Sequence, residues 1–286
     1  MAIEVPPFPV GRRPVTGRVA DWVELSALAR RVAFKRGDLR SAISVEDIEA
    51  PERVEEATWA ELKWRSELYG DRWPLRLTGQ RLTRRSPSPA DLWFYRFLCL
   101  CGLGSLDDAD RQLFELVIAE LVSALTGSPS LHVGHPASSG QHASFRQRVE
   151  DYVNASGILK QEVMNPLLPD DKDLGLDVVS WIPFRDSRGG AVHFLAQCAT
   201  GSDWKNKLND IDLDVWSYHI NWCVSPVRVF AVPFALRMAP ERWVRLNAQA
   251  GMVVDRPRLL ELAERVPLSA GLRKAVRKRA LVLSVP

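Results

Sequence analysis

Two apolar runs separated by a turn signal constrain the fold more than any other feature of this sequence. Residues 176–182 and 191–196 are built largely from Val, Ile, Leu, Phe and Trp, which are residue types enriched in strands. The segment between them, residues 183–190, contains Asp-Ser-Arg-Gly-Gly, a sequence typical of a hairpin loop. We therefore expect an antiparallel pair of strands here.

Helices and further strands are expected to alternate on both sides of this hairpin. Strands that are joined through helices form a mixed sheet with helices packed on its faces, so the fold class of this part is α/β (mixed α+β). In chain order we expect helix 110–125, strand 131–133, helix 144–154, the hairpin, helix 204–222, strand 227–232, helix 240–250, strand 252–254 and helix 257–265.

The first hundred residues show mainly the helical period and no obvious chemistry. The change of pattern predicts a helical N-terminal domain, residues 1–105, and an α/β domain, residues 106–286. Within the first domain we expect helices at residues 19–34, 47–69 and 90–103 and a short extended segment within residues 73–82.

Composition places the chain among globular proteins of a reducing compartment. Of its 286 residues, 46% are hydrophobic and 26% are charged, which excludes disorder of the whole chain. The four cysteines form no C-x-x-C pair and no zinc pattern, so we expect reduced thiols and a cytoplasmic location. The N-terminus lacks the apolar core of a signal peptide, and no apolar stretch is long enough for a membrane span.

An acidic residue, Asp177, lies within the first apolar run. A carboxylate in such surroundings costs several kcal/mol unless it is paired, protonated or bound to a cation. Gln197 ends the second run, and its carbonyl oxygen is an acceptable ligand for a hard divalent ion. Because a hairpin brings the two positions together, we expect both oxygens to converge on one ion at the edge of the sheet.

These residues resemble the motif of the PD-(D/E)xK (restriction-endonuclease-like) nuclease superfamily. That family has a hairpin with Asp on its first strand and Glu/Gln-x-Lys on its second, preceded by a helix that often contains Glu and followed by a helix and a strand. Asp177 matches the Asp, and Gln197 matches the glutamine form seen in Mrr-like restriction nucleases. Glu115 matches the helical Glu. The agreement runs from about residue 108 to about residue 235 and leaves the first hundred residues without a counterpart.

The sequence departs from the family pattern at the lysine. Two residues after Gln197 stands Ala199, and a lysine there would share the face of Gln197, because side chains alternate along a strand. The family tolerates migration of this lysine to an adjacent element. The resemblance therefore favours Lys205 over the nearby Lys207, in the first turn of a helix that Asp203 is expected to cap. Without such a replacement the site is inactive.

The resemblance implies a nuclease that hydrolyses phosphodiester bonds in DNA with Mg²⁺ or Mn²⁺. Ions held by Asp177, Gln197 and Glu115 would lower the pKa of a bound water, and the lysine would stabilise developing negative charge. A role in defence against foreign DNA rests on family analogy alone, and a homo-oligomer or partner proteins of a larger system are compatible with it. Two alternatives stay open: a catalytically inactive nuclease-fold subunit that binds nucleic acid or a partner protein, and a metal-dependent phosphodiesterase that acts on RNA or nucleotides.

Histidines and arginines complete the set of candidates. Basic side chains cluster in residues 81–85 and again in residues 273–279, and the second cluster would suit phosphate contacts or form a solvated helix face. Three histidines surround a loop rich in Ser and Gly, at spacings that fit no helix face, and are expected to be solvated: His132, His135 and His142.

Overall fold

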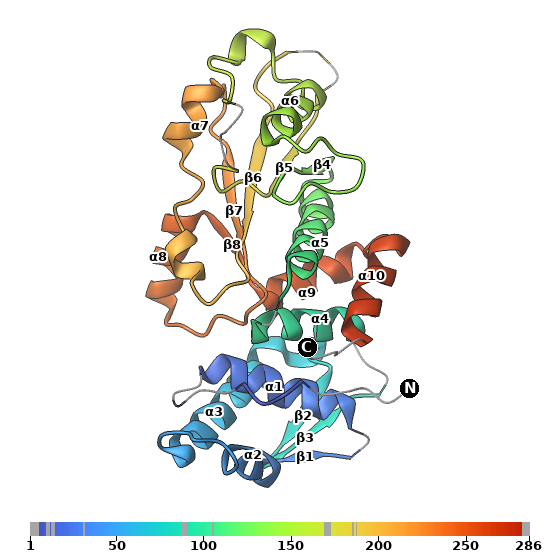
Figure 1. Cartoon of the computed structure of the whole chain (residues 1–286), viewed down its shortest axis with the longest axis vertical. Coiled ribbons are helices and arrows are strands. Elements are labelled where there is room, and N and C mark those ends of the chain that lie inside the picture. Colours follow the sequence, from blue (N-terminus) through green and yellow to red (C-terminus); the bar gives the residue numbers. More distant parts are fainter. Residues whose placement is uncertain are drawn as a thin grey trace.

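The fold contains a five-stranded mixed sheet with helices on both faces (Figure 1). The structure, a computed structural model, describes residues 6–9, 12, 15–30, 32–86, 91–104, 106–168, 173–184, 186 and 188–281. The first three strands are antiparallel, the last three are parallel, and the mixed α/β fold class is confirmed. The strand order is β4 (Ser130–His132), β5 (Val178–Trp181), β6 (His193–Cys198), β7 (Val227–Ala231) and β8 (Met252–Val254).

The predicted hairpin is confirmed as β5 and β6, with Val178 opposite Ala196. Strand β6 pairs with β7 in parallel, and β7 pairs with β8 in parallel. Parallel neighbours need a crossover connection, which α7 (Leu213–His219) and α8 (Pro240–Ala250) provide. The hairpin therefore lies in the middle of the sheet, where β5 is buried along its whole length.

Helices cover both faces of the sheet because adjacent side chains of a strand point to opposite sides. Val178 belongs to the same hydrophobic cluster as the apolar side chains of α5 (Asp108–Thr126). Its neighbour Val179 belongs to a second cluster, formed with α6 (Phe145–Ser156) and α7. Phe230 of β7 packs in a third cluster with α8. These layers hold the hairpin rigidly from both sides.

The helix expected at residues 204–222 is wrong, because the structure breaks it into two. A short 3₁₀ helix, η3 (Trp204–Lys207), comes first, and α7 follows after a turn. Asp212 ends the turn by capping α7, since its side chain accepts hydrogen bonds from the backbone N–H groups of Asp214 and Val215. Asp and Asn compete with a continuing helix in this way, so the Asn-Asp-Ile-Asp sequence starts a new helix instead of extending the first.

Up to Leu103, the described residues form four α-helices, one 3₁₀ helix and a small antiparallel sheet of order β1-β3-β2. The segment expected to be extended at residues 73–82 belongs to a hairpin, turned by Gly79 at a positive φ of 58°. The first expected helix ends early, and α2 is an additional helix. The elements are α1 (Thr16–Ala29), β1 (Phe34–Lys35), α2 (Arg36–Ile43), α3 (Pro51–Tyr69), η1 (Gly70–Arg72), β2 (Leu75–Thr78), β3 (Arg81–Arg84) and α4 (Leu92–Leu103).

The C-terminal helices join this first part to the sheet. Helix α10 (Ala270–Leu281) packs against α4, and α9 (Arg256–Arg265) packs against α5 (Figure 1). One hydrophobic cluster continues from α1 and α4 to the sheet, and the predicted division near residue 105 stays a prediction. A short 3₁₀ helix, η2 (Lys160–Glu162), completes the described elements. Each helix of the described residues is too short or too polar to span a lipid bilayer.

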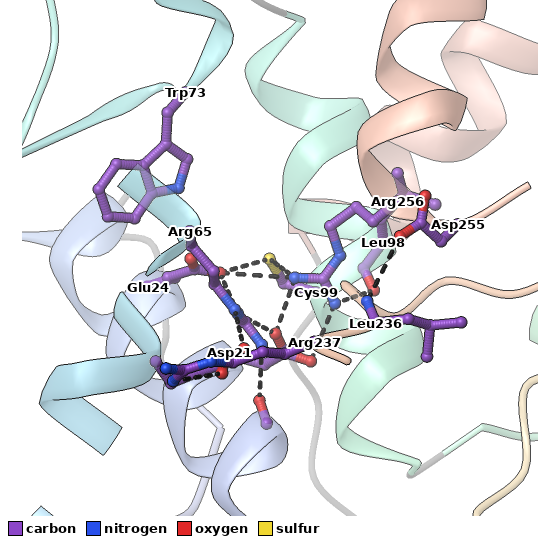
Figure 2. Close-up of polar contacts among 12 residues, drawn as sticks. Asp21, Glu24, Arg65, Trp73, Leu98, Cys99, Leu236, Arg237, Asp255 and Arg256 are labelled. Atoms are coloured by element: carbon purple, nitrogen blue, oxygen red, sulfur yellow. Dashed lines mark hydrogen bonds and ion pairs between the residues drawn. The ribbon is translucent and has the colours of Figure 1, made fainter. Parts of the chain in front are cut away.

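A buried network of ion pairs lies where these parts meet (Figure 2). The guanidinium of Arg256, at the start of α9, binds both carboxylate oxygens of Asp21 in α1, at 2.7 and 2.9 Å. Arg65 of α3 binds Asp21 at 2.6 Å and Glu24 at 2.9 Å. Such paired contacts are the strong form of a charge-assisted hydrogen bond. Residues more than 230 positions apart are thereby fixed to one another.

We expect Arg256→Met to lower the free energy of unfolding by about 3–5 kcal/mol, because it breaks the buried network and leaves the carboxylates of Asp21 and Glu24 to share the guanidinium of Arg65. Urea denaturation followed by tryptophan fluorescence measures this loss. The control is Arg265→Met in the same helix, which removes an exposed ion pair with Glu261 and should cost less than about 1 kcal/mol. Equal losses for the two variants would contradict a structural role of the buried network.

Candidate functional site

A cavity of about 480 Å³ lies at the open end of the β5–β6 hairpin, the end away from its turn, and beside the first half of α5. Its lining includes three residues proposed from the sequence, namely Glu115, Asp177 and Gln197. They come from α5, from the residue that precedes β5 and from β6. Segments far apart in the sequence therefore bring three oxygen-bearing side chains to one cavity.

The side chain of Asp177 is bonded to β6, and its main chain is bonded to the segment that follows β4. Asp177 lies one residue before β5 and not within the strand, and it is 9% exposed. Its Oδ2 accepts a hydrogen bond from the amide N–H of Cys198 at 2.7 Å, and its carbonyl oxygen accepts from Val133 and Gly134. Burial raises the pKa of Asp177 well above the ordinary value for aspartate, and the nearby charge of Glu115 raises it further.

Glu115 reaches the same point from α5. A side chain at Gly134 would place its Cβ 2.8 Å from Asp177 Oδ1 and 3.1 Å from Glu115 Oε2, so both carboxylates crowd against a position that only glycine leaves open. Glu115 Oε2 also forms a hydrogen bond of 2.6 Å with His132 Nε2. The two acids are thus held close together by the protein, despite their mutual repulsion.

Gln197 is oriented by a carboxylate. Its side chain is 5% exposed, and Nε2 donates a hydrogen bond of 2.8 Å to Asp210 Oδ2. The amide oxygen, Oε1, accepts no hydrogen bond from the described residues. It is also not one of the fully buried side-chain atoms that lack a partner. This amide oxygen therefore stays accessible in a residue that lines the cavity.

Lys207, and not the favoured Lys205, lines the cavity. The ammonium of Lys205 lies over the ring of Trp204, 5.6 Å from its centroid, whereas the charge of Lys207 acts on Asp177 and lowers its pKa against the effect of burial. Both lysines lie in η3, and of the two only Lys207 is among the described residues that line the cavity, so the preference for Lys205 finds no support here. Asp203 occupies the N-cap position of η3 as expected, but its side chain makes no capping hydrogen bond, and the residue lines the cavity instead.

The position that carries the lysine in the family pattern is closed. Ala199 is fully buried and packs in the hydrophobic cluster of Phe230 and α8. It directly follows β6 and packs with Phe230, the register partner of Gln197, so it lies on the face of Gln197 as expected but does not line the cavity. A lysine at this position would meet apolar side chains, which explains on physical grounds why alanine stands there.

His132 shows where reasoning from the sequence fails. The sequence predicts a solvated side chain, but His132 ends β4 and is 4% exposed. Its Nε2 contacts Glu115, and its Nδ1 contacts the hydroxyl of Ser138 at 2.8 Å. The signal available in the sequence is its place between Leu131 and Val133, which is the pattern of a strand and not of a loop. His135 lines the cavity, and His142 is exposed as expected.

The charge of the cavity favours a cation. Among the described residues that line it, six are acidic, and only Arg111 and Lys207 carry a permanent positive charge. Carboxylate and amide oxygens are the ligands that Mg²⁺ and Mn²⁺ prefer, so these residues fit a divalent ion. The acidic residues are Asp108, Glu115, Asp173, Asp177, Asp203 and Asp210.

A second buried group of possible metal ligands, Asp21, Glu24 and Cys99, offers no comparable site. Arg65 and Arg256 already bind these carboxylates, and Arg256 also contacts the sulfur of Cys99 at 3.4 Å (Figure 2). Positive charge from the protein thus takes the place that a metal ion would need. Its role is structural.

Comparison with known proteins gives no match, because no family model, curated protein or solved structure is significantly similar to this chain. Its function is therefore inferred from the residues of the cavity.

We expect Asp177→Asn to raise the thermal stability of the metal-free protein at pH 7 to 8. Because the pKa of Asp177 is raised on folding, the unfolded chain loses this proton first as the pH rises. The stability of the wild-type protein therefore falls from about pH 4 upward, through the range between the ordinary pKa and the raised one. Asparagine has no such proton, and its Oδ1 still accepts from Cys198.

Thermal melts in EDTA between pH 4 and 8 measure this effect. The gain in Tm should grow with pH and disappear at the acid end of the range. The control, Asp151→Asn, changes an exposed aspartate in α6 and should leave the Tm nearly unchanged at every pH. If Asp177→Asn is less stable than wild type at pH 8, burial of the Asp177 carboxylate does not destabilise the metal-free protein and the prediction is wrong.

Proposed function

We propose that this protein is a divalent-metal-dependent nuclease that hydrolyses phosphodiester bonds in DNA. The observation that carries the proposal is the convergence of Glu115, Asp177, Gln197 and Lys207 in one acidic cavity. The pKa shift of Asp177 adds support, since perturbed carboxylates cluster at functional sites. No ion pair within the described residues neutralises Asp177, so a cation has a place there.

The order of the elements supports the resemblance to the PD-(D/E)xK nucleases. Helix α5 with Glu115 comes first, the β5–β6 hairpin with Asp177 and Gln197 follows, and α7 then leads to β7, parallel to β6. This is the order expected for that family. Lys207 stands on the element that follows the hairpin, in line with migration of the lysine from the strand.

Each side chain has a chemical role in this proposal. Asp177, Glu115 and the amide oxygen of Gln197 would hold Mg²⁺ or Mn²⁺, and the bound metal would acidify a water and neutralise a phosphodiester oxygen. His132 fixes the orientation of Glu115 through their short hydrogen bond, as outer partners of metal ligands do. Lys207 would stabilise the negative charge that develops on the phosphate.

The substrate and the setting follow from the resemblance and from the charges of α10. DNA and a role in defence come from the resemblance alone, and the exposed cations of α10, between residues 273 and 278, suit contacts with phosphates. A cytoplasmic location is favoured by the free thiols Cys99, Cys101, Cys198 and Cys223. Ala199 favours the second candidate, an inactive nuclease-fold subunit that binds nucleic acid or a partner protein, and Lys207 argues against it.

We expect the purified protein to cleave plasmid or linear DNA with Mg²⁺ or Mn²⁺ and to lose this activity in EDTA. Asp177→Asn should lower cleavage by at least about 100-fold, since it removes a charged metal ligand. Gel assays on DNA and on RNA measure both the activity and the choice of substrate. Cleavage that survives the substitution would reject this site, and a purely binding protein would retain DNA without cutting it in any metal.

Two neighbouring lysines provide a matched test of the assigned cation. We expect Lys207→Ala to reduce the rate of cleavage by about 100-fold, the typical loss of one group that stabilises transition-state charge. Lys205→Ala should keep the rate within about threefold of wild type, because the ammonium of Lys205 lies over Trp204 and its removal leaves transition-state charge stabilisation intact. Single-turnover rates at saturating metal compare the two variants. A larger loss for Lys205→Ala would reverse the assignment.

A further inference from the structure

As a metal ligand, glutamine at position 197 has to present the correct end of its side chain, which glutamate would not. A carboxylate offers the same oxygen on either side, whereas an amide offers oxygen on one side and an NH₂ group on the other. An amide that turns its nitrogen to a cation repels it. A site that uses Gln197 as a ligand therefore needs a second group that fixes which way the amide faces.

Asp210 is placed to be that group. Its Oδ2 lies 2.8 Å from Gln197 Nε2, and because an ionised carboxylate only accepts hydrogen bonds, it selects the nitrogen of the amide. The opposite atom, Oε1, accepts no hydrogen bond from the described residues and remains accessible. One contact thus settles the direction of the only uncharged oxygen ligand proposed for the site.

The backbone around Asp210 is built for this contact. The amide of Asp210 donates to the carbonyl of Lys207 at 3.1 Å, in the same turn that ends η3. Gly175 packs directly against it: a Cβ there would lie 2.6 Å from the carbonyl carbon and from the Cβ of Asp210. Gly175 has a φ of 73°, which glycine adopts without strain. The close approach holds the turn against the segment that leads to Asp177.

We propose that Asp210 is a positioning residue of the cation site: it holds the amide of Gln197 so that Oε1 faces the metal. The inference rests on the proposed metal-dependent function and deepens it. The alternative is a simpler role, in which Asp210 attracts the cation only by its negative charge. The two roles differ in how the effect of Asp210 depends on the residue at position 197.

The experiment is a double-mutant cycle with Asp210→Asn and Gln197→Glu in the full chain. The dissociation constant of Mn²⁺ is measured by electron paramagnetic resonance titration without DNA, and thermal melts verify folding. In the protein with Gln197, Asp210→Asn should weaken Mn²⁺ binding by about 10-fold, the usual effect of losing an outer partner, because asparagine accepts from or donates to either side of the amide. In the Gln197→Glu protein the same change should not weaken binding, since the introduced asparagine amide would donate to the new carboxylate, which the native Asp210 repels.

The matched control is Asp203→Asn, which removes one negative charge from the same cavity without a contact to Gln197; it should have a smaller effect that is the same in both backgrounds. Equal losses from Asp210→Asn in both backgrounds would overturn the positioning role and leave the metal site standing. Failure of the wild-type protein to bind Mn²⁺ would overturn the proposed nuclease itself, and the inference with it.

Discussion

The carboxyl groups of Asp177 and Glu115 are held close together at the end of the hairpin, where burial first and then the charge of Glu115 raise the pKa of Asp177. Within the described residues, no arginine or lysine forms an ion pair with Asp177. The contrast is the buried carboxylate of Asp21, which binds two guanidinium groups. Asp21 is therefore neutralised by arginines of the protein, whereas Asp177 has no such partner. A cation from solution can supply the positive charge that Asp177 lacks.

Apolar packing around the site offsets the unfavourable burial of these acidic groups. Strand β5 is buried on both faces, and Phe114 and Val117, which flank Glu115 on α5, are fully buried. Burial of large apolar side chains contributes roughly 1.5–3 kcal/mol each, which offsets the unfavourable placement of a few charges. The close-packed interior also keeps the two carboxylates from moving apart. Pre-organisation of this kind is what a metal site requires of its ligands.

The sequence is informative where the local pattern decides the structure. Hairpin β5–β6, strands β7 and β8 and helix α8 follow from periodicity and turn residues, and three proposed side chains, Asp177, Gln197 and Glu115, line one cavity. It is misleading where tertiary contacts decide. Both Lys205 and Lys207 lie in η3, and the choice between them depends on the packing that places Lys205 over Trp204 and Lys207 at the cavity.

Burial of His132 depends on packing of β4 against α5, the preceding helix, and the period of neither element alone records that contact. The contact between Asp210 and Gln197 likewise depends on the turn after η3. Local periodicity thus locates the elements that carry the site, whereas the exact partners of each side chain arise from how those elements pack.

A glutamine at position 197 suits a cavity that is already strongly acidic. A third carboxylate beside Asp177 and Glu115 would add repulsion in the metal-free state, whereas an amide oxygen adds a ligand without adding charge. In the proposed function the same acidity would act on the substrate, because a phosphodiester is an anion that this cavity would repel until divalent cations reversed the local charge. In the proposed function, loading of the metal therefore precedes productive docking of DNA. Lys207 and Arg111 together bring too little positive charge to replace it, since six acidic residues line the cavity.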